Sequence, residues 1–196
     1  MNRVIAGGLT AAGILLGSAS NAAAAPVEAA KDKVAVVYFS WSQTGNTRFA
    51  AETIARKASA TGPFEIKAVK PYNANYKACC DEAKPECFGR KLRPIRQVAG
   101  LNLSKYDVIF VGTPNWWGTM APPVRTFLVQ NAALLKGKTL CLFQTNGGGG
   151  MQNCEKDFAE LLTDSKVLPA QAFNGSSIRS QVSALEQFVA DRIKLK

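Results

Sequence analysis

The stretch VAVVYFSWSQTGNT, residues 34–47, decides the fold of this 196-residue chain. Its first six residues form an unbroken β-branched and aromatic run, which is typical of a strand buried on both faces. A turn-rich segment follows, and helical periodicity begins at Thr47, with Ala50, Ile54 and Ala58 on one stripe. A buried strand that leads through a polar turn into a helix predicts the start of a parallel α/β sheet.

The same alternation continues along the chain. Strands separated by helices require crossover connections, which place helices on both faces of a parallel sheet. The sequence therefore predicts an α/β fold with a doubly wound five-stranded parallel sheet. The remaining strands are expected at 64–69, 108–112, 139–143 and 167–172, and the helices at 122–128, 154–162 and 182–193, with another at 75–84 that ends at Pro85.

The N-terminal segment has the three regions of a secretory signal peptide. Arg3 is followed by an apolar run at 4–16 and by small residues with Ala-x-Ala options up to residue 25. An uncleaved membrane anchor is the less favoured alternative, because the run is short for a hydrocarbon core of ~30 Å. We expect a signal peptide at 1–25, a short linker at 26–32 and one domain at 33–196. Export then predicts a periplasmic or secreted protein with no stable membrane insertion after signal removal.

Composition excludes several kinds of chemistry. Histidine is absent, which removes Ser-His-Asp and Cys-His nucleophile systems, histidine-ligated metals and a histidine general base. The formal net charge of +10 favours an anionic ligand or partner, although charge alone does not say which. Apolar residues make up 47% of the chain, which is a globular composition rather than that of a disordered chain.

Three loops lie where such a sheet binds ligands, at the carboxyl ends of its strands. The loop at 40–47 offers hydroxyls, a turn glycine and a helix N-terminus, which together favour an anion; the alternative is an ordinary capped helix start. It contains neither G-x-x-x-x-G-K-[ST] nor G-x-G-x-x-G. The loop at 113–123 has adjacent tryptophans, which either stack on a flat ligand or cover the core edge. The loop at 145–151 has four glycines, which expose backbone to a ligand; the alternative is a flexible linker.

Taken together, these loops resemble the flavodoxin family. The resemblance rests on residues 36–47, on 106–118 with its Trp-Trp-Gly sequence, and on the Gly-rich loop, and it runs from about Lys33 to the C-terminus. It implies a flavodoxin-like fold with FMN as the cofactor. By resemblance, the FMN phosphate would be held by Ser42, Gln43, Thr44, Gly45, Asn46 and Thr47, and the isoalloxazine would be flanked by Thr113, Pro114, Asn115, Trp116, Trp117, Gly118, Thr119, Thr145, Asn146, Gly147, Gly148 and Gly149.

The resemblance implies an FMN protein that transfers electrons to or from a redox partner protein or a small electron acceptor, and the N-terminal pattern predicts that it is exported. Two alternatives remain: an FMN-dependent NAD(P)H or quinone oxidoreductase on the same fold, and a binding module with a decayed site. Export argues against the reductase, because nicotinamide cofactors are not expected to be plentiful outside the cytoplasm. We expect no nucleic-acid partner. Flavodoxins are usually acidic and this chain is basic, so a familiar flavodoxin partner is not implied.

Five cysteines remain to be placed. Cys141 and Cys154 fit a strand and an apolar helix stripe, so both are expected in the core. In an oxidising compartment, Cys87 is predicted to form a disulfide with either Cys79 or Cys80. A metal site is less favoured, because paired C-x-x-C motifs are absent.

Overall fold

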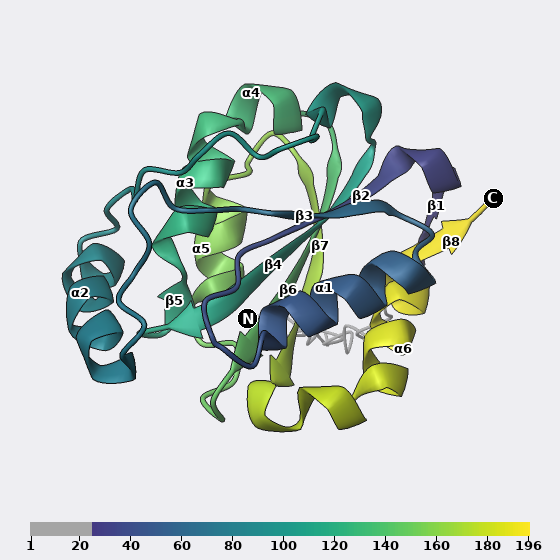
Figure 1. The fold of residues 1–196 in the computed structure, drawn as a ribbon. Coiled ribbons are helices and arrows are strands. Elements are labelled where there is room, and N and C mark those ends of the chain that lie inside the picture. Colours follow the sequence, from purple (N-terminus) through teal and green to yellow (C-terminus); the bar gives the residue numbers. More distant parts are fainter. Residues whose placement is uncertain (1–24) are drawn as a thin grey trace, which may run out of the picture.

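Five parallel strands form the centre of the computed structural model, which describes residues 25–196 (Figure 1). Their order reverses beside the first of them, since the chain passes outward to one edge and then returns to the other side. This arrangement confirms the predicted doubly wound parallel sheet. The switch point, where such sheets bind ligands, lies between the strands at residues 34–38 and 108–116. In spatial order the strands are β3 (Thr61–Glu65), β2 (Val34–Tyr38), β4 (Val108–Trp116), β6 (Thr139–Asn146) and β7 (Lys166–Asn174), and the short β5 (Thr119–Met120) pairs antiparallel with the end of β4.

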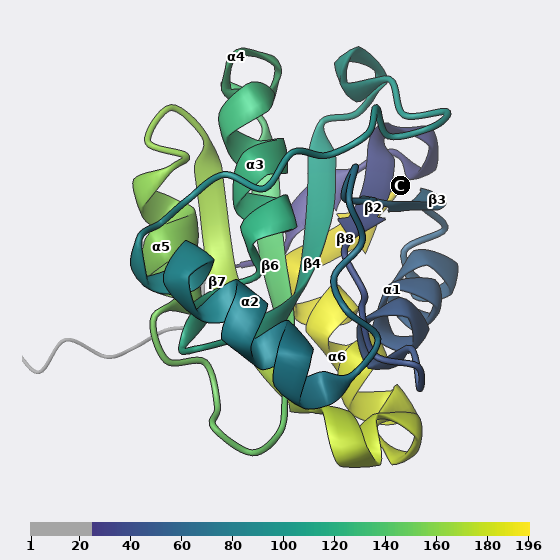
Figure 2. The ribbon, with the colours of Figure 1, turned by 60° about the vertical axis from the view of Figure 1, so that its left-hand side comes forward.

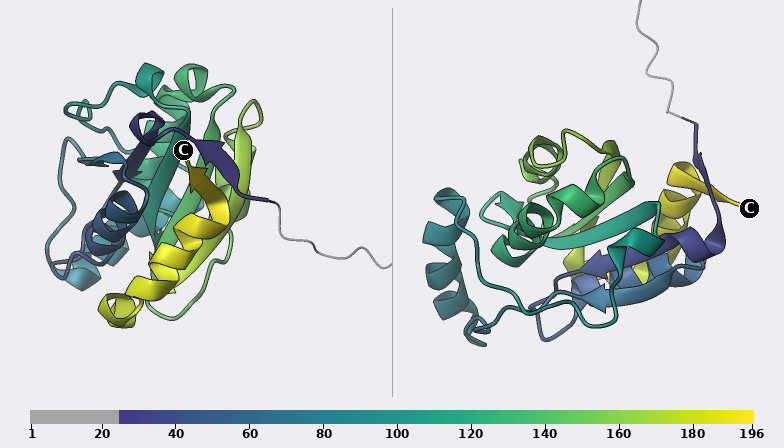
Figure 3. Two further views of the ribbon diagram at one scale, coloured as in Figure 1. Left: turned by 90° about the vertical axis from the view of Figure 1, so that its right-hand side faces the viewer. Right: turned by 90° about the horizontal axis from the view of Figure 1, so that it is seen from above.

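Helices cover both faces of the sheet. α1 (Asn46–Lys57) and α6 (Val182–Arg192) lie together on one face (Figure 3). α3 (Pro122–Gln130), α4 (Ala132–Leu135) and α5 (Cys154–Glu160) cover the other (Figure 1). Alternate residues of β2 divide between the two cores, since Val34 and Val36 pack with α1 and α6 whereas Ala35 and Val37 face α3. The short helices η1 (Lys31–Lys33), η2 (Leu103–Lys105) and η3 (Gly175–Ser180) complete the fold.

The helix α2 (Tyr76–Phe88) lies against α3 and the end of β4 rather than within either layer (Figure 2). The prediction that this helix ends at Pro85 is wrong, because the helix continues one turn beyond it. That turn buries Cys87 and brings Glu86 to Arg93, with 2.8 Å between Nη1 and Oε1, which offsets the hydrogen bond that proline cannot make.

The edge strand β3 begins and ends earlier than the predicted 64–69. After Glu65 the chain leaves the sheet, and Ala68 makes an isolated antiparallel bridge with Ile95. Only Phe64 and Glu65 of the predicted run 64–69 therefore belong to the sheet. The rest of that run supports the connection that leads to α2.

The two ends of the described chain pair with each other. β1 (Val27–Ala29) is parallel to β8 (Ile193–Leu195), as seen beside α6 in Figure 3. Residues 26–32, expected as a short linker, contain β1 and the start of η1; strands of three residues are too short to show periodicity in sequence. The predicted signal peptide falls almost wholly on residues 1–24, which lie outside the described residues. Within 25–196, no helix is both long and apolar enough to cross a membrane.

Candidate functional site

The loop between β2 and α1 closes into a tight turn whose amides lead into the helix. Gly45 adopts φ +62°, and its N–H donates to the Ser42 carbonyl at 2.8 Å. The Ser42 hydroxyl receives the Asn46 N–H at 3.4 Å and the Thr44 hydroxyl at 3.3 Å. The first turn of α1 contains no acidic residue, so nothing there neutralises the positive end of the helix dipole. This end of the loop is arranged to receive an anion.

The end of β6 and the segment after β7 meet at this helix start. The hydroxyls of Thr47 and Thr145 lie 2.7 Å apart and join α1 to the end of β6. Gly175, after β7, packs so closely that a Cβ there would lie 2.8 Å from Asn46 Nδ2 and 3.2 Å from the Asn146 carbonyl. A larger residue at 175 would have to displace the Asn46 side chain, so the segment after β7 lies in close contact with the start of α1.

The tryptophan loop is a tight hairpin rather than an open loop. β4 extends through Trp116, which pairs with Thr119 of β5. The two turn residues, Trp117 and Gly118, have φ values of +53° and +82°, as a two-residue hairpin turn with right-handed twist requires. A large side chain at positive φ is uncommon, so the hairpin holds Trp117 in a strained backbone conformation.

The two tryptophan side chains have different surroundings. Trp116 makes edge contacts with Tyr72, Phe39 and Trp41, at ring-centroid distances of 4.8, 5.6 and 6.2 Å. Trp117 is 42% exposed and lies against α2, where its Nε1–H donates to the Cys80 carbonyl at 3.1 Å. The ring of Trp116 is thus fixed by an aromatic cluster, whereas the ring of Trp117 bridges the hairpin and α2.

Two asparagines brace the loops through their carboxamides. Asn115 Nδ2 donates to the Gly150 carbonyl at 3.0 Å, and its Oδ1 accepts the Gly118 N–H at 3.0 Å. Asn146 Oδ1 accepts the N–H groups of Gly148 and Gly150 at 2.8 and 3.2 Å. Both side chains are therefore occupied with loop backbone, and their effect on a ligand is to set the shape of the tryptophan and glycine loops.

A cavity of about 700 Å³ lies between these loops and α2; we call it the main cavity. One end has the hydroxyl and amide groups of the β2–α1 loop, and the other end is aromatic. None of its lining residues is charged. They are Trp41, Ser42, Asn46, Thr47, Tyr76, Cys79, Cys80, Ala83, Pro114, Asn115, Trp116, Trp117, Thr145, Asn146, Gly147, Gly175 and Ser176.

Most of the predicted site residues surround the main cavity or the cleft next to it. Gly118 and Gly149 line that cleft together with the carboxamides of Gln152 and Asn153. Gln43 lies on a different cavity, on the β3 side of the loop. Thr44, Gly45 and Gly148 shape the turns but do not line the main cavity.

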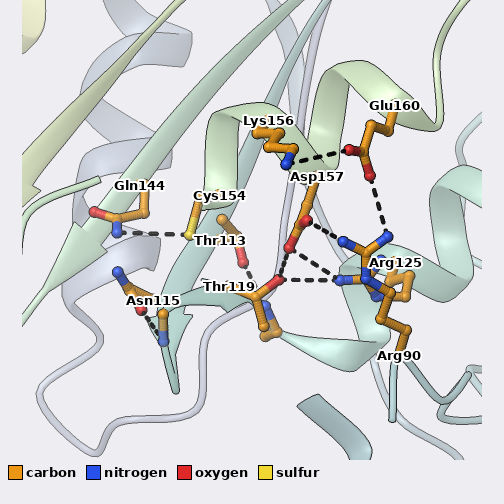
Figure 4. Close-up of polar contacts among 12 residues, drawn as sticks. Arg90, Thr113, Asn115, Thr119, Arg125, Gln144, Cys154, Lys156, Asp157 and Glu160 are labelled. Atoms are coloured by element: carbon orange, nitrogen blue, oxygen red, sulfur yellow. Dashed lines mark hydrogen bonds and ion pairs between the residues drawn. The ribbon is translucent and has the colours of Figure 1, made fainter. Parts of the chain in front are cut away.

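Two predicted residues are buried in the hairpin support instead. The Thr113 hydroxyl receives the Ala121 N–H at 3.0 Å, and the Thr119 hydroxyl contacts Asp157 and Arg125 (Figure 4). Neither threonine lines the main cavity. Their hydroxyls hold the tryptophan hairpin against α3 and α5.

Sequence reasoning missed the contribution of α2. Tyr76, Cys79, Cys80 and Ala83 line the main cavity; the sequence predicts a helix at 75–84, but its low amphipathicity gave no sign of a cavity wall. Trp41 could have been predicted as a site residue, since it lies in the same loop as the predicted phosphate residues.

The disulfide prediction is wrong, and all three cysteines of α2 are free. Residues seven or eight positions apart on a helix are separated by roughly 10–12 Å at 1.5 Å per residue, whereas a disulfide needs Cα atoms within about 7 Å. Burial raises the pKa of Cys79 and that of Cys87 to about 12. These two thiols pack α2 onto the core. Cys141 and Cys154 are also buried, at the core positions predicted for them.

A buried cluster around Arg93 holds α2 in place. Arg93 bonds Glu82 and Glu86 at 2.8 Å each and covers the Tyr72 ring at 4.0 Å. Burial and a hydrogen bond to Glu86 raise the pKa of Tyr72. Because Tyr72 contacts Trp116, this cluster fixes α2 and the aromatic end of the main cavity together.

An open, doubly wound sheet with a cavity across the carboxyl ends of its central strands defines an α/β protein that binds a ligand at its switch point. The chain belongs to the flavodoxin family, since the model of a family described as flavodoxin matches residues 33–189.

Solved structures agree with this membership. A flavoprotein from Lactobacillus acidophilus in complex with FMN is 26% identical, with a TM-score of 0.63, over 78% of this chain and 99% of that one. A flavoprotein from Bacteroides uniformis is 25% identical, with a TM-score of 0.65, over 80% and 97%. A WrbA-like flavodoxin from Agrobacterium tumefaciens, 17% identical with a TM-score of 0.54 over 80% and 92%, has a similar fold.

Proposed function

We propose that this protein binds FMN in the main cavity and serves in electron transfer outside the cytoplasm. The observation that carries the proposal is that one uncharged cavity joins a helix N-terminus to an aromatic end. FMN has matching parts, a phosphate dianion and a flat ring system. Bound FMN supplies one- and two-electron redox chemistry, for which a protein provides binding, orientation and electrostatics.

The phosphate end fits without any basic side chain. Ser42, Asn46 and Thr47 line it, and hydroxyls, backbone N–H groups and the α1 dipole favour a dianion there. Hydroxyls and backbone N–H groups are thus present as the hydrogen-bond donors that a phosphate dianion requires. Charge-assisted hydrogen bonds from these groups supply both affinity and orientation.

The aromatic end fits a flat ring. Trp41, Tyr76, Trp116 and Trp117 all line it, and the Asn115 and Asn146 braces keep the two flanking loops in place. These rings would exclude water from the flavin and place π-density beside it. Both effects disfavour the anionic hydroquinone relative to the oxidised form, because charge is costly in a dry and electron-rich site.

A second candidate function is an FMN-dependent oxidoreductase acting on NAD(P)H or a quinone. The observation that favours it is the wall formed by α2. Tyr76, Cys80 and Ala83 of this helix enclose part of the main cavity, where a small substrate would need room. A carrier requires access for a partner protein at this end, whereas a reductase requires room for a substrate beside the ring.

Two measurements test these proposals. Purified protein should show the absorption bands of oxidised FMN, bleach with dithionite and recover in air; a protein that neither retains FMN nor takes it up in titration would contradict the proposal. Steady-state assays with NADH, NADPH and a soluble quinone then separate the functions. Turnover above the rate of free FMN supports the oxidoreductase, and its absence supports the carrier.

Export is a separate part of the proposal. The apolar and small-residue pattern of residues 1–25 supports it. Mass spectrometry of protein from its own cells should find an N-terminus between Ala24 and Val27, next to the start of β1 at Val27. A full-length product in the cytoplasm would contradict export while leaving the FMN site untouched.

A further inference from the structure

A second cavity, of about 480 Å³, lies on the β3 side of the β2–α1 loop; we call it the outer cavity. Among residues 25–196, Trp41 alone lines both this cavity and the main cavity. Its indole is fixed from outside by an Nε1–H donated to the Asn73 carbonyl at 3.1 Å. A ligand in the outer cavity would therefore contact the same indole that borders the main cavity.

Positive charge predominates around the outer cavity. Arg48, Lys67 and Arg96 line it, with Glu65 as the single carboxylate among its lining residues. Glu65 is shared, since it lies 3.0 Å from Arg48 Nη2 and 3.4 Å from Lys67 Nζ. Within residues 25–196, no ion pair engages Arg96, whose backbone N–H is held at 2.8 Å from the Lys67 carbonyl. The cavity therefore carries uncompensated positive charge.

A hydroxyl without a partner lies in the same place. Among the described residues, Ser40 Oγ is the only buried side-chain nitrogen or oxygen that makes no hydrogen bond. Ser40 lines the outer cavity but not the main one. Buried polar groups are nearly always hydrogen-bonded, so each exception calls for a partner such as a ligand, an ion or a water molecule. In the conformation shown this hydroxyl is closed off from solvent, so it reaches an acceptor in the outer cavity by rotation about the Ser40 Cα–Cβ bond.

Apolar groups complete the lining. Ile66, Ala68 and Pro71 lie on the same cavity as the Trp41 ring. The combination favours a ligand with an acidic group at one end and a flat apolar part at the other. Inorganic anions match only the charged part.

We propose that the outer cavity binds a small organic anion, a carboxylate or phosphate attached to a flat apolar group, through Ser40, Arg96 and the Trp41 ring. This inference goes beyond FMN binding, because it concerns a second ligand on the opposite side of Trp41. The shared indole couples the two sites. A ligand in the outer cavity therefore changes the surroundings of the Trp41 ring, which also lines the aromatic end of the main cavity.

The test uses protein labelled with ¹⁵N at the tryptophan indoles, after its FMN content has been measured from the absorption spectrum. Benzoate and phenyl phosphate are titrated as probes, with benzamide as a neutral match and inorganic phosphate as the charge-only match. The expected result is a saturable shift of the Trp41 indole signal, assigned with Trp41→Phe. Benzoate or phenyl phosphate should bind at least tenfold more tightly than benzamide. The stronger of the two identifies the acidic group.

Variants locate the binding groups. Arg96→Gln should weaken the better probe about threefold or more, while Lys91→Gln, the same charge change at an exposed residue outside the cavity, should have no effect. Ser40→Ala gives the sharpest test, because it removes a buried hydroxyl that has no partner. It should leave the ligand-free protein as stable or more so, yet weaken probe binding; a structural hydroxyl would give the opposite result for stability.

Equal binding of benzoate and benzamide, or unchanged affinity in both Arg96→Gln and Ser40→Ala, would overturn the proposal. So would a shift of the indole signals of Trp116 and Trp117 without that of Trp41. Failure of FMN binding is seen separately in the absorption spectrum. The outer cavity can be titrated in either case.

Discussion

The hydroxyls of Thr47 and Thr145 lie 2.7 Å apart, although the two residues are 98 positions apart in the chain. Thr47 belongs to the first turn of α1, and Thr145 to the end of β6. Both are almost fully buried, at 2% and 4% exposure. The contact makes the proposed phosphate end and the glycine loop one unit, so a change at either residue is expected to affect both.

A double-mutant cycle measures this contact. Thr47→Val and Thr145→Val should each lower the free energy of unfolding by about 1–3 kcal/mol, because each leaves a buried hydroxyl without its partner. The double variant should lose less than the sum of the two. Urea denaturation of the FMN-free protein provides the values. Strict additivity would show that the two hydroxyls do not support each other.

Phosphate recognition is separable from ring recognition. Ser42→Ala removes a hydroxyl that lines the main cavity and organises the turn through Asn46 and Thr44. Loss of a charge-assisted hydrogen bond of about 1.5–3 kcal/mol should weaken FMN roughly 10- to 150-fold. Riboflavin, which has no phosphate, should bind with little change. Fluorescence titration with both flavins checks this, with the exposed Ser104→Ala as the control. Equal losses for FMN and riboflavin would place the phosphate elsewhere.

The two tryptophans should respond differently to substitution. Trp116→Ala removes a ring packed on Tyr72 and Phe39, and we expect a loss of stability of about 2–4 kcal/mol. Trp117→Gly removes the exposed ring while suiting its φ of +53°, so the fold should persist. FMN fluorescence quenching should fall in this variant, affinity should drop, and the reduction potential should rise. If quenching, affinity and potential are all unchanged, Trp117 supports α2 alone.

The sheet and its ligand-binding edge were predictable because they depend on local signals. The apolar run at 34–39 and the glycines at 147–150 mark a buried strand and an exposed loop wherever the chain places them. The extent of α2 was not predictable, because a proline ends most helices, whereas here the turn after Pro85 is held by the pairing of Glu86 with Arg93, which lies beyond the helix. The braces at Asn115 and Asn146 also depend on loop geometry, which has no counterpart in spacing or composition.

Thiol reactivity should distinguish Cys80 from the other four cysteines. Burial raises the pKa of Cys79, Cys87, Cys141 and Cys154 to about 12 each, so each has very little thiolate at pH 8. Iodoacetamide should therefore modify Cys80 in the folded protein and reach the others only after unfolding or as the pH approaches 12. Peptide mapping by mass spectrometry locates the label, and Cys80→Ser is the control. FMN should slow the labelling, because Cys80 lines the main cavity. Labelling of all five at one rate would contradict the burial of α2.

The last prediction concerns the buried ion cluster beneath the tryptophan hairpin (Figure 4). Asp157 accepts a hydrogen bond from the Thr119 hydroxyl and lies 3.4 Å from Arg125 Nη2. Its Oδ1 also pairs with Nη2 of Arg90, just after α2, at 3.1 Å. Arg125 and Asp157 are each 4% exposed. Asp157→Ala would leave the Arg125 charge buried without its partner, which should lower the free energy of unfolding by about 3–5 kcal/mol.

The controls separate the buried pair from its exposed neighbour. Glu160→Gln breaks only exposed bridges, to Arg90 at 3.1 Å and to Lys156 at 3.9 Å, so the loss should stay below about 1 kcal/mol. Arg125→Met combined with Asp157→Leu removes both buried charges and should recover most of the stability lost in Asp157→Ala. FMN affinity should be lower than in the unsubstituted protein both in Asp157→Ala and in this double variant, because the Thr119 hydroxyl no longer has the carboxylate that fixes the hairpin. Urea denaturation and FMN titration of the same variants test the two effects separately. Full FMN affinity in the double variant would show that the hairpin holds its position without the cluster.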